Sequence, residues 1–111
     1  MTVFVIQEPD ANKNILSASD FGELEFVLPA RENMMYSPAP TVARIKHALR
    51  NFADEDYLLL MGDPAAIGIA SSIASHINAG KFKMLKWDRQ EAMYLPININ
   101  LKYFGEYDEQ S

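Results

Sequence analysis

The 111-residue chain carries 10 basic and 15 acidic residues, a net charge of −5, with 49% hydrophobic residues and no cysteine. This length and composition are typical of one folded domain with a single core. The lack of cysteine excludes disulfides, thiolate metal sites and a cysteine nucleophile. No apolar run approaches the ~20 residues of a membrane-spanning helix, and the acidic balance disfavours generic binding to nucleic acid. We therefore expect a soluble, intracellular domain.

The first quarter of the chain predicts two strands. Thr2 to Gln7 is largely apolar and precedes a polar loop that contains Pro9. Residues 22–28 alternate apolar and acidic side chains, which predicts a strand with one face in the core and the other in water. Its core face is expected to hold Leu24, Phe26 and Leu28, opposite Glu23 and Glu25. The intervening residues 15–21 are compatible with more than one structure.

The rest of the chain alternates helix and strand. Pro38 and Pro40 suit the first turn of a helix, and the expected helix 40–52 directs an apolar face inward. That face consists of Val42, Ile45, Leu49 and Phe52. Residues 57–61 form a continuous apolar run, as in a strand covered on both faces. A second helix is expected over 64–78, and two strands over 81–87 and 93–100, the last with Pro96 at an edge or bulge.

These elements give the order β-β-α-β-α-β-β, which predicts an α/β fold. The alternation favours right-handed crossovers and a mixed, mainly parallel sheet of about five strands with two main helices. We expect one compact domain over residues 1–104 and a frayed acidic tail over residues 105–111.

The turn before the second helix is the most informative local pattern. Gly62 releases the backbone, Asp63 can accept hydrogen bonds from the first free amides, and Pro64 fits the first helical position. Such a turn can also bind phosphate. The candidate contacts for a nucleotide or metabolite are Gly62, Asp63, Ala65 and Ala66. Because the segment lacks G-x-G-x-x-G and P-loop patterns, and Asp63 would repel a phosphate, a simple helix cap is the favoured interpretation.

The second helix is rich in small residues. Its expected inward residues are Ile67, Ala70, Ile73, Ala74 and Ile77. Ala66, Gly68 and Ser71 leave little bulk, which predicts close packing within the domain or across the two-fold interface of a homodimer. Enlarging Gly68 to leucine is then expected to disrupt that contact.

The stretch from Lys81 to Arg89 interleaves basic and aromatic residues. Lysines on an edge strand also discourage aggregation, so a structural role is the first interpretation. Contact with a protein is the second, because tryptophan and arginine dominate many interfaces, and contact with nucleic acid is the third. The candidate partner-binding residues are Lys86, Trp87, Arg89 and Tyr94.

No catalytic set is specified by spacing. His47 belongs to a helix face with basic neighbours, and His76 lies near two serines. A serine nucleophile also needs an oxyanion hole and an orienting acid, which nothing in the sequence indicates. The acidic run from Asp54 to Asp56 is interpreted as a solvated turn rather than a cation site. We predict no catalytic residue, no metal and no cofactor.

Four segments spread over nearly the whole chain resemble a family. They are Val3 to Pro9, Phe21 to Leu24, Asp54 to Leu58 leading into Gly62-Asp63-Pro64, and Leu85 to Arg89 followed by Tyr94-Leu95-Pro96. Together they resemble a group of short hypothetical proteins encoded by tailed bacteriophages. The resemblance implies a viral protein in the host cytoplasm, and it carries over no activity or functional residue.

The sequence therefore predicts a small non-enzymatic binding or regulatory protein, a phage accessory protein that acts through a host or viral protein partner. A homodimer is compatible with the small-residue helix, and neither nucleic acid nor a membrane is an expected partner. The alternative is a small nucleotide- or metabolite-binding domain that uses the turn at Gly62-Asp63-Pro64.

Overall fold

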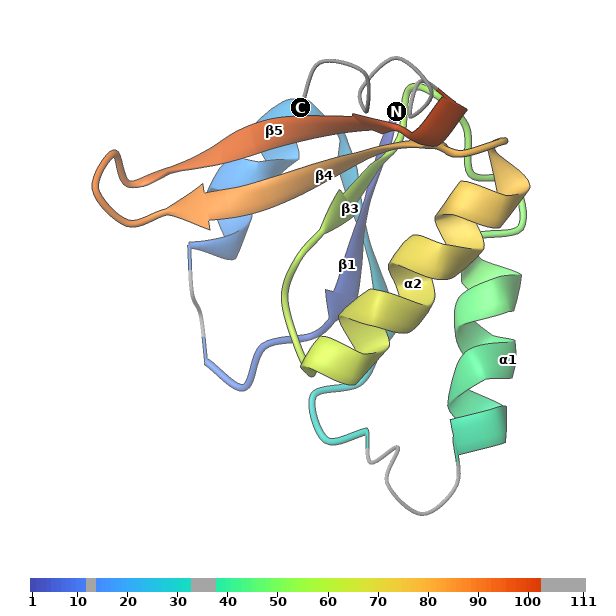
Figure 1. Ribbon diagram of the computed structural model, residues 1–111. Helices are drawn as coiled ribbons and strands as arrows, with labels where there is room; N and C mark the ends of the chain where they lie inside the picture. Colours follow the sequence, from blue (N-terminus) through green and yellow to red (C-terminus); the bar gives the residue numbers. More distant parts are fainter. Residues whose placement is uncertain (12–13, 33–37, 103–111) are drawn as a thin grey trace, which may run out of the picture.

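The computed structural model describes residues 1–11, 14–32 and 38–102, and in them a five-stranded sheet of order β2-β1-β3-β4-β5 (Figure 1). The expected tail at 105–111 lies outside these residues. The elements are β1 (Thr2–Gln7), η1 (Ile15–Phe21), β2 (Glu23–Leu28), α1 (Pro38–Ala48), β3 (Tyr57–Leu59), α2 (Pro64–Ile77), β4 (Lys81–Asp88) and β5 (Met93–Asn100). In this part of the chain, no helix has the length and apolar character needed to cross a membrane.

The α/β class and the single five-stranded sheet are confirmed, but the expectation of a mainly parallel sheet needs correction. Strand β1 pairs in parallel with β2 and β3, and β3 pairs in parallel with β4, whereas β4 and β5 are antiparallel. The antiparallel ladder runs from Lys81 opposite Asn100 to Asp88 opposite Met93, and it is the longest of the four. The sheet is therefore mixed. The two parallel ladders that β3 forms are short, because β3 ends at Leu59 rather than at residue 61.

The connections pass over both faces of the sheet. Figure 1 shows α1 and α2 on one side, while η1, light blue, lies on the other. The β1–η1–β2 crossover moves across the sheet in the opposite direction from the β2–α1–β3 and β3–α2–β4 crossovers and uses the opposite face. All three crossovers therefore have the same handedness, as expected for parallel connections.

The core is divided by the sheet into two clusters. On the side of the α-helices, Phe4, Ile6 and Leu58 pack against Ile45 and the small side chains of α2. On the η1 side, the members are Val3, Val5, Ile15, Ala18, Leu59, Leu85 and Tyr94. Residues 15–21, which the sequence left open, thus form a short 3-10 helix that covers the second face.

The inward face of α2 differs from the expected one. Ala66, Ala70 and Ala74 are buried, whereas Ile67 and Ile73 are partly buried and Ile77 is 38% exposed. Alanines at four-residue spacing let the helix approach the sheet closely, which moves the isoleucines to the flanks. A Cβ on Gly68 would meet no atom within 4 Å. Among the residues that the structure describes, the expected packing at Gly68 is therefore absent.

Edge strand β2 is less regular than its alternating sequence predicts. Val27 and Leu28 are buried, but Phe26 is 46% exposed. Phe26 stands opposite Val5 in the parallel ladder, on the face that η1 covers only in part. The expectation that Phe26 lies in the core is therefore wrong, and Val27 from the opposite face is buried instead, because both faces of the sheet are covered near the end of β2 but not at Phe26.

Candidate functional site

The turn between β3 and α2 is built as its residues predict. The backbone of Gly62 has a φ of 122°, which favours glycine. The Asp63 carboxylate accepts a hydrogen bond at 2.8 Å from the amide of Ala65, and Pro64 begins the helix. The predicted helix cap is confirmed.

This turn lies at the topological switch point of the sheet. Strands β1 and β3 are neighbours, and the connections that follow them leave toward opposite faces. In open α/β sheets, ligands commonly bind at the carboxyl ends of two such strands. The location therefore agrees with the alternative function expected at Gly62-Asp63-Pro64.

The side chain of Gln7 occupies this point. It is 6% exposed, its oxygen accepts from the amide of Asp63 at 2.7 Å, and its nitrogen donates to the carbonyls of Pro29 and Ala30 at 3.1 and 3.3 Å. A Cβ on Gly62 would lie 2.3 Å from the Cβ of Gln7. The carboxamide therefore takes up backbone groups at the place where a ligand would otherwise bind them.

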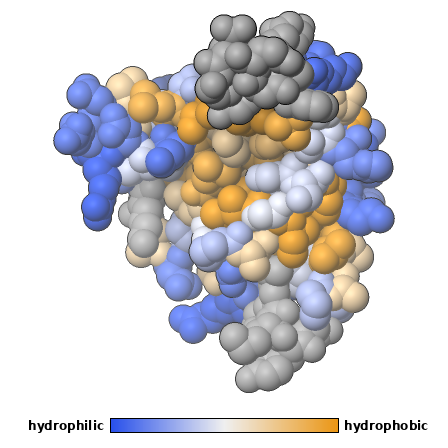
Figure 2. Space-filling model, viewed as in Figure 1, coloured by the Kyte–Doolittle hydropathy of each residue, from blue (hydrophilic) through white to orange (hydrophobic). Residues whose placement is uncertain are grey.

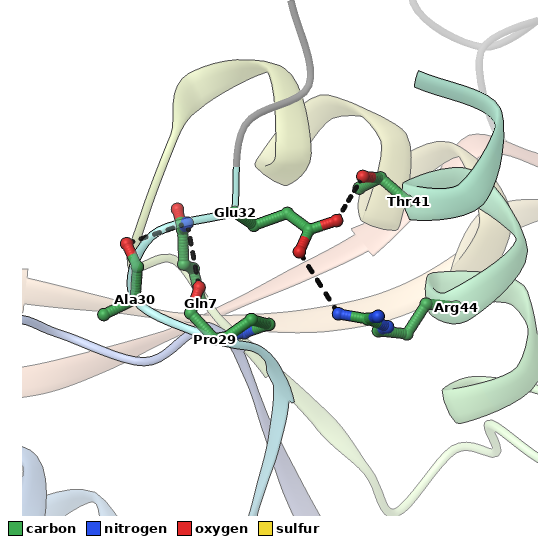
Figure 3. Close-up of polar contacts among 6 residues, drawn as sticks. All are labelled: Gln7, Pro29, Ala30, Glu32, Thr41 and Arg44. Carbon is green, nitrogen blue, oxygen red and sulfur yellow. Dashed lines mark hydrogen bonds and ion pairs between the residues drawn. The ribbon is translucent and has the colours of Figure 1, made fainter. Parts of the chain in front are cut away.

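The same polar cluster continues to α1 (Figure 3). The Glu32 carboxylate accepts from the hydroxyl of Thr41 at 2.5 Å and from the guanidinium of Arg44 at 3.1 Å. Thr41 is 1% exposed. This cluster joins the segment after β2 to β1 and to α1. Sequence reasoning missed Gln7 and Glu32; the one available signal was a glutamine at the end of an otherwise apolar strand.

The remaining predicted ligand contacts diverge. Ala65 is exposed at the first turn, whereas Ala66 is fully buried toward the sheet. Two of the first backbone amides of α2 already have acceptors. The amide of Ala65 donates to the Asp63 side chain, and the amide of Ile67 donates to the Asp63 carbonyl at 3.0 Å. The described contacts are thus those of a stabilised helix start.

Replacing Asp63 by alanine is expected to lower the free energy of unfolding by about 0.5–2 kcal/mol, because the amide of Ala65 loses its acceptor. Asparagine or serine, which also cap helices, are expected to cost much less. Urea unfolding of the three variants measures the order. An alanine variant as stable as Asp63→Asn would show that the cap contributes nothing.

The β4–β5 hairpin does not bring its four predicted partner-binding residues to one surface. Trp87 and Tyr94 stand opposite each other, with ring centroids 4.9 Å apart, on the face covered by η1. Tyr94 is only 4% exposed and is part of the core. Lys86 is exposed on the opposite face, and Arg89 is exposed at the turn. Because Lys86 and the Trp87–Tyr94 pair lie on opposite faces of the hairpin, a partner bound to one face would not contact both.

The Tyr94 hydroxyl is buried without a hydrogen-bond partner among the described residues. Burial raises the pKa of Tyr94 above its ordinary value of 10.0. Replacing Tyr94 by phenylalanine, which removes only this hydroxyl, is expected to leave stability unchanged or raise it by up to about 1 kcal/mol.

The raised pKa of Tyr94 also makes the stability of the folded protein depend on pH in alkaline solution. The folded protein holds the Tyr94 proton more tightly than the unfolded chain does. The contribution of this proton to the free energy of unfolding is therefore complete below pH 10 and is lost as the pH rises through the folded pKa. Above pH 10, the free energy of unfolding should fall less steeply with pH for Tyr94→Phe than for the wild type. Equal slopes would show that Tyr94 ionises as an ordinary tyrosine.

The other lysines of the basic–aromatic stretch have partners within the chain. Lys81 lies 3.8 Å from the carboxylate of Asp54, and the ammonium of Lys83 lies 4.1 Å from the ring centre of Tyr57. A hydrogen bond from Asn78 and the charge of Lys81 lower the pKa of Asp54. Of the acidic run, Asp54 and Glu55 are exposed, whereas Asp56 is buried. No group of three or more metal-ligating side chains occurs in the described ranges.

Helices α1 and α2 form a further concave surface between them. Its lining consists of Lys46, Arg50, Ser72, Ile73, His76 and Ile77, around a volume of about 470 Å³. Neither helix contains an acidic residue, although the whole chain has a net charge of −5. We call this surface the α1–α2 groove. Its residues come from two helices, and the packing of one helix against the other cannot be recognised from the periodicity of either.

Comparison with known proteins gives one assignment. No curated protein and no solved structure matches the chain. One family model matches residues 1–101, nearly the whole chain, which confirms the resemblance to phage proteins. The chain belongs to the family of phage Pam3 gp32-like proteins.

Proposed function

We propose that the protein is a non-enzymatic phage accessory protein that acts in the host cytoplasm by binding an acidic segment of a host or viral protein. The observation that carries this proposal is the α1–α2 groove, with a basic rim and an apolar floor in an otherwise acidic protein. The proposed occupant is an amphipathic helix whose apolar side contacts the isoleucines and whose carboxylates reach the cations.

The rim of the groove supplies the charge. Lys46 and Arg50 are exposed, and the Arg50 guanidinium donates to the carbonyl of His47 at 2.7 Å, which fixes it near the end of α1. Cations near a helix carboxyl end also interact favourably with the helix dipole. That effect accounts for the position of Lys46 and Arg50 at and just beyond the end of α1, but it does not require the neighbouring isoleucines to be open to solvent.

The floor supplies the apolar contact. Ile73 is partly buried at the border of the core, and Ile77 is 38% exposed, so α2 leaves apolar surface open beside its contact with the sheet. Helix-in-groove recognition combines such an apolar surface with charged residues at its border. An acidic occupant also gains from attraction to Lys46 and Arg50, which guides association and discriminates against basic segments.

The hairpin at Lys86 and Arg89 is the second candidate surface, and charge reversal separates the two. We suggest capturing partners from a lysate of the natural host or of infected cells, treated with nuclease, and then purifying the captured protein to measure its Kd. Lys46→Glu with Arg50→Glu tests the groove. Lys86→Glu with Arg89→Glu is the matched control, because it changes the net charge by the same amount.

We expect the groove variant to weaken binding at least tenfold and the hairpin variant to bind as the wild type does. The wild-type affinity should fall with increasing salt. The reverse pattern would place the interface on the hairpin. A partner that binds both variants unchanged, or binding that vanishes on nuclease treatment, would contradict the proposal. Circular dichroism checks that both variants fold.

The alternative, a nucleotide- or metabolite-binding domain, is supported by the place of Gly62-Asp63-Pro64 at the topological switch point. It requires Gln7 to release its bonds to Pro29, Ala30 and Asp63. A thermal-shift panel of nucleotides and related metabolites tests it, since a ligand that binds only the folded state raises the Tm. Saturable stabilisation that persists in the groove variant would favour this alternative.

A further inference from the structure

Strand β5 ends the sheet and exposes an uncharged edge. From Met93 to Leu101 the chain has no charged residue. Edge strands of monomeric proteins are commonly protected by charged side chains, because an open row of backbone groups can pair with another strand. The other edge strand, β2, has such protection in the exposed side chains of Glu23 and Glu25. The two edges of one sheet therefore differ, because β2 has two exposed carboxylates whereas β5 has one proline, Pro96, and no charge.

The side chains of β5 alternate between two faces of the sheet, and one of these faces is apolar along the whole strand. Its odd-numbered residues share the face of the α-helices and are Met93, Leu95, Ile97 and Ile99, followed by Leu101. Met93, Leu95 and Leu101 are 48, 41 and 52% exposed. Figure 2 shows hydrophobic side chains gathered along this side of the hairpin and over the adjoining α2. Helix α2 packs mainly on β4 and β1.

The backbone of the even-numbered residues faces the free edge. The amide of Leu60 donates to the carbonyl of Leu85 at 3.1 Å, so the backbone groups of Leu85 point toward β3. Pro96, which stands opposite Leu85, therefore directs its ring nitrogen and carbonyl outward. By the same alternation, the amides and carbonyls of Asn98 and Asn100 also face this edge.

We propose that β5 pairs with β5 of a second copy in an antiparallel, two-fold symmetric ladder centred on Asn98. In this register Asn98 faces Asn98 of the second copy, and Asn100 faces Pro96, whose carbonyl still accepts a hydrogen bond. Between them, Ile97 meets Ile99 and Leu95 meets Leu101. The strand is thus complementary to itself, and no like charges meet although each copy is acidic.

The pairing joins the two sheets with the α-helices of both copies on the same side, because the two-fold axis is perpendicular to the sheet. The exposed apolar residues of both hairpins then form one strip between the two α2 helices. This interface is separate from the α1–α2 groove and does not depend on the proposed function.

Engineered cysteines test the register, because the chain has no cysteine of its own. In Asn98→Cys the two thiols face each other across the axis, with Cα atoms about 5.5 Å apart, which suits a disulfide. In Asn100→Cys the two thiols lie on opposite sides of the axis and too far apart. After mild oxidation, we expect a covalent dimer for Asn98→Cys and little for Asn100→Cys. Equal cross-linking of both would overturn the register.

Sedimentation gives the second measurement. The wild type is expected to dimerise as its concentration rises through the micromolar range. Asn98→Pro removes an amide that faces the edge and has no role in pairing with β4, so it should give a monomer with an unchanged circular dichroism spectrum. Leu16→Lys, on the exposed surface of η1, is the control and should still dimerise. A monomeric wild type or a dimeric Asn98→Pro variant would overturn the proposal. If the wild type is monomeric, the β5 edge could instead pair with a strand of another protein.

Discussion

Replacing Leu58 by alanine is expected to lower the free energy of unfolding by about 2–5 kcal/mol, one of the largest effects of any single substitution in this chain. Leu58 is fully buried in β3, between Phe4 of β1 and Met84 of β4 in the ladder, and it contributes to the cluster on the side of the α-helices. The surrounding strands cannot move inward without breaking their hydrogen bonds, so the truncation leaves a cavity. The Tm should fall by roughly 8 °C or more.

Urea unfolding measures this loss, with an unchanged slope indicating that the unfolded state is the same. Leu16→Ala is the matched control, because Leu16 is 70% exposed and its loss should change stability by less than about 0.5 kcal/mol. A loss below about 1 kcal/mol at Leu58 would mean that the core relaxes around the missing atoms. It would argue against a rigid interior strand.

Replacing Gly62 by alanine is expected to cost about 2–4 kcal/mol, from backbone strain and from polar groups left without partners. The φ of 122° is unfavourable for alanine, and the new Cβ would lie 2.3 Å from the Cβ of Gln7. Because that contact is with an atom next to the backbone, Gln7 must move as a whole. Its hydrogen bonds to Pro29, Ala30 and Asp63 would then weaken together.

Gly68→Ala is the matched control for Gly62→Ala. Gly68 lies in α2, where an added Cβ meets open space, so alanine should raise stability by about 0.5–1 kcal/mol through its better helix propensity. Opposite signs for the two substitutions are the expected result. A tolerated alanine at Gly62 would mean that the Gln7 cluster is adaptable and that a ligand could displace it, which would strengthen the alternative function.

Local features of the fold could be predicted from the sequence because their causes are local. The apolar run before Gly62 predicted an interior strand, and Leu58 and Leu59 are buried, although Leu60, beyond the end of β3, is only partly so. Asp63 and Pro64 predicted the start of α2 at the correct residue. Hydrogen-bonding capacity, helix caps and the fixed φ of proline act within a few residues, so they can be recognised without knowing what lies elsewhere.

The tertiary structure decided which of these residues meet. Tyr94 and Trp87 looked like surface anchors, but the antiparallel pairing brings them together under η1, while strand alternation sends Lys86 to the other face. Gln7 gained its role only because β1 and β3 are neighbours at the switch point. By itself, the sequence determined the elements and their caps, since these depend on neighbours along the chain. Strand order and helix packing determined the filled switch point, the α1–α2 groove and the open β5 edge, because each depends on contacts between residues far apart in sequence.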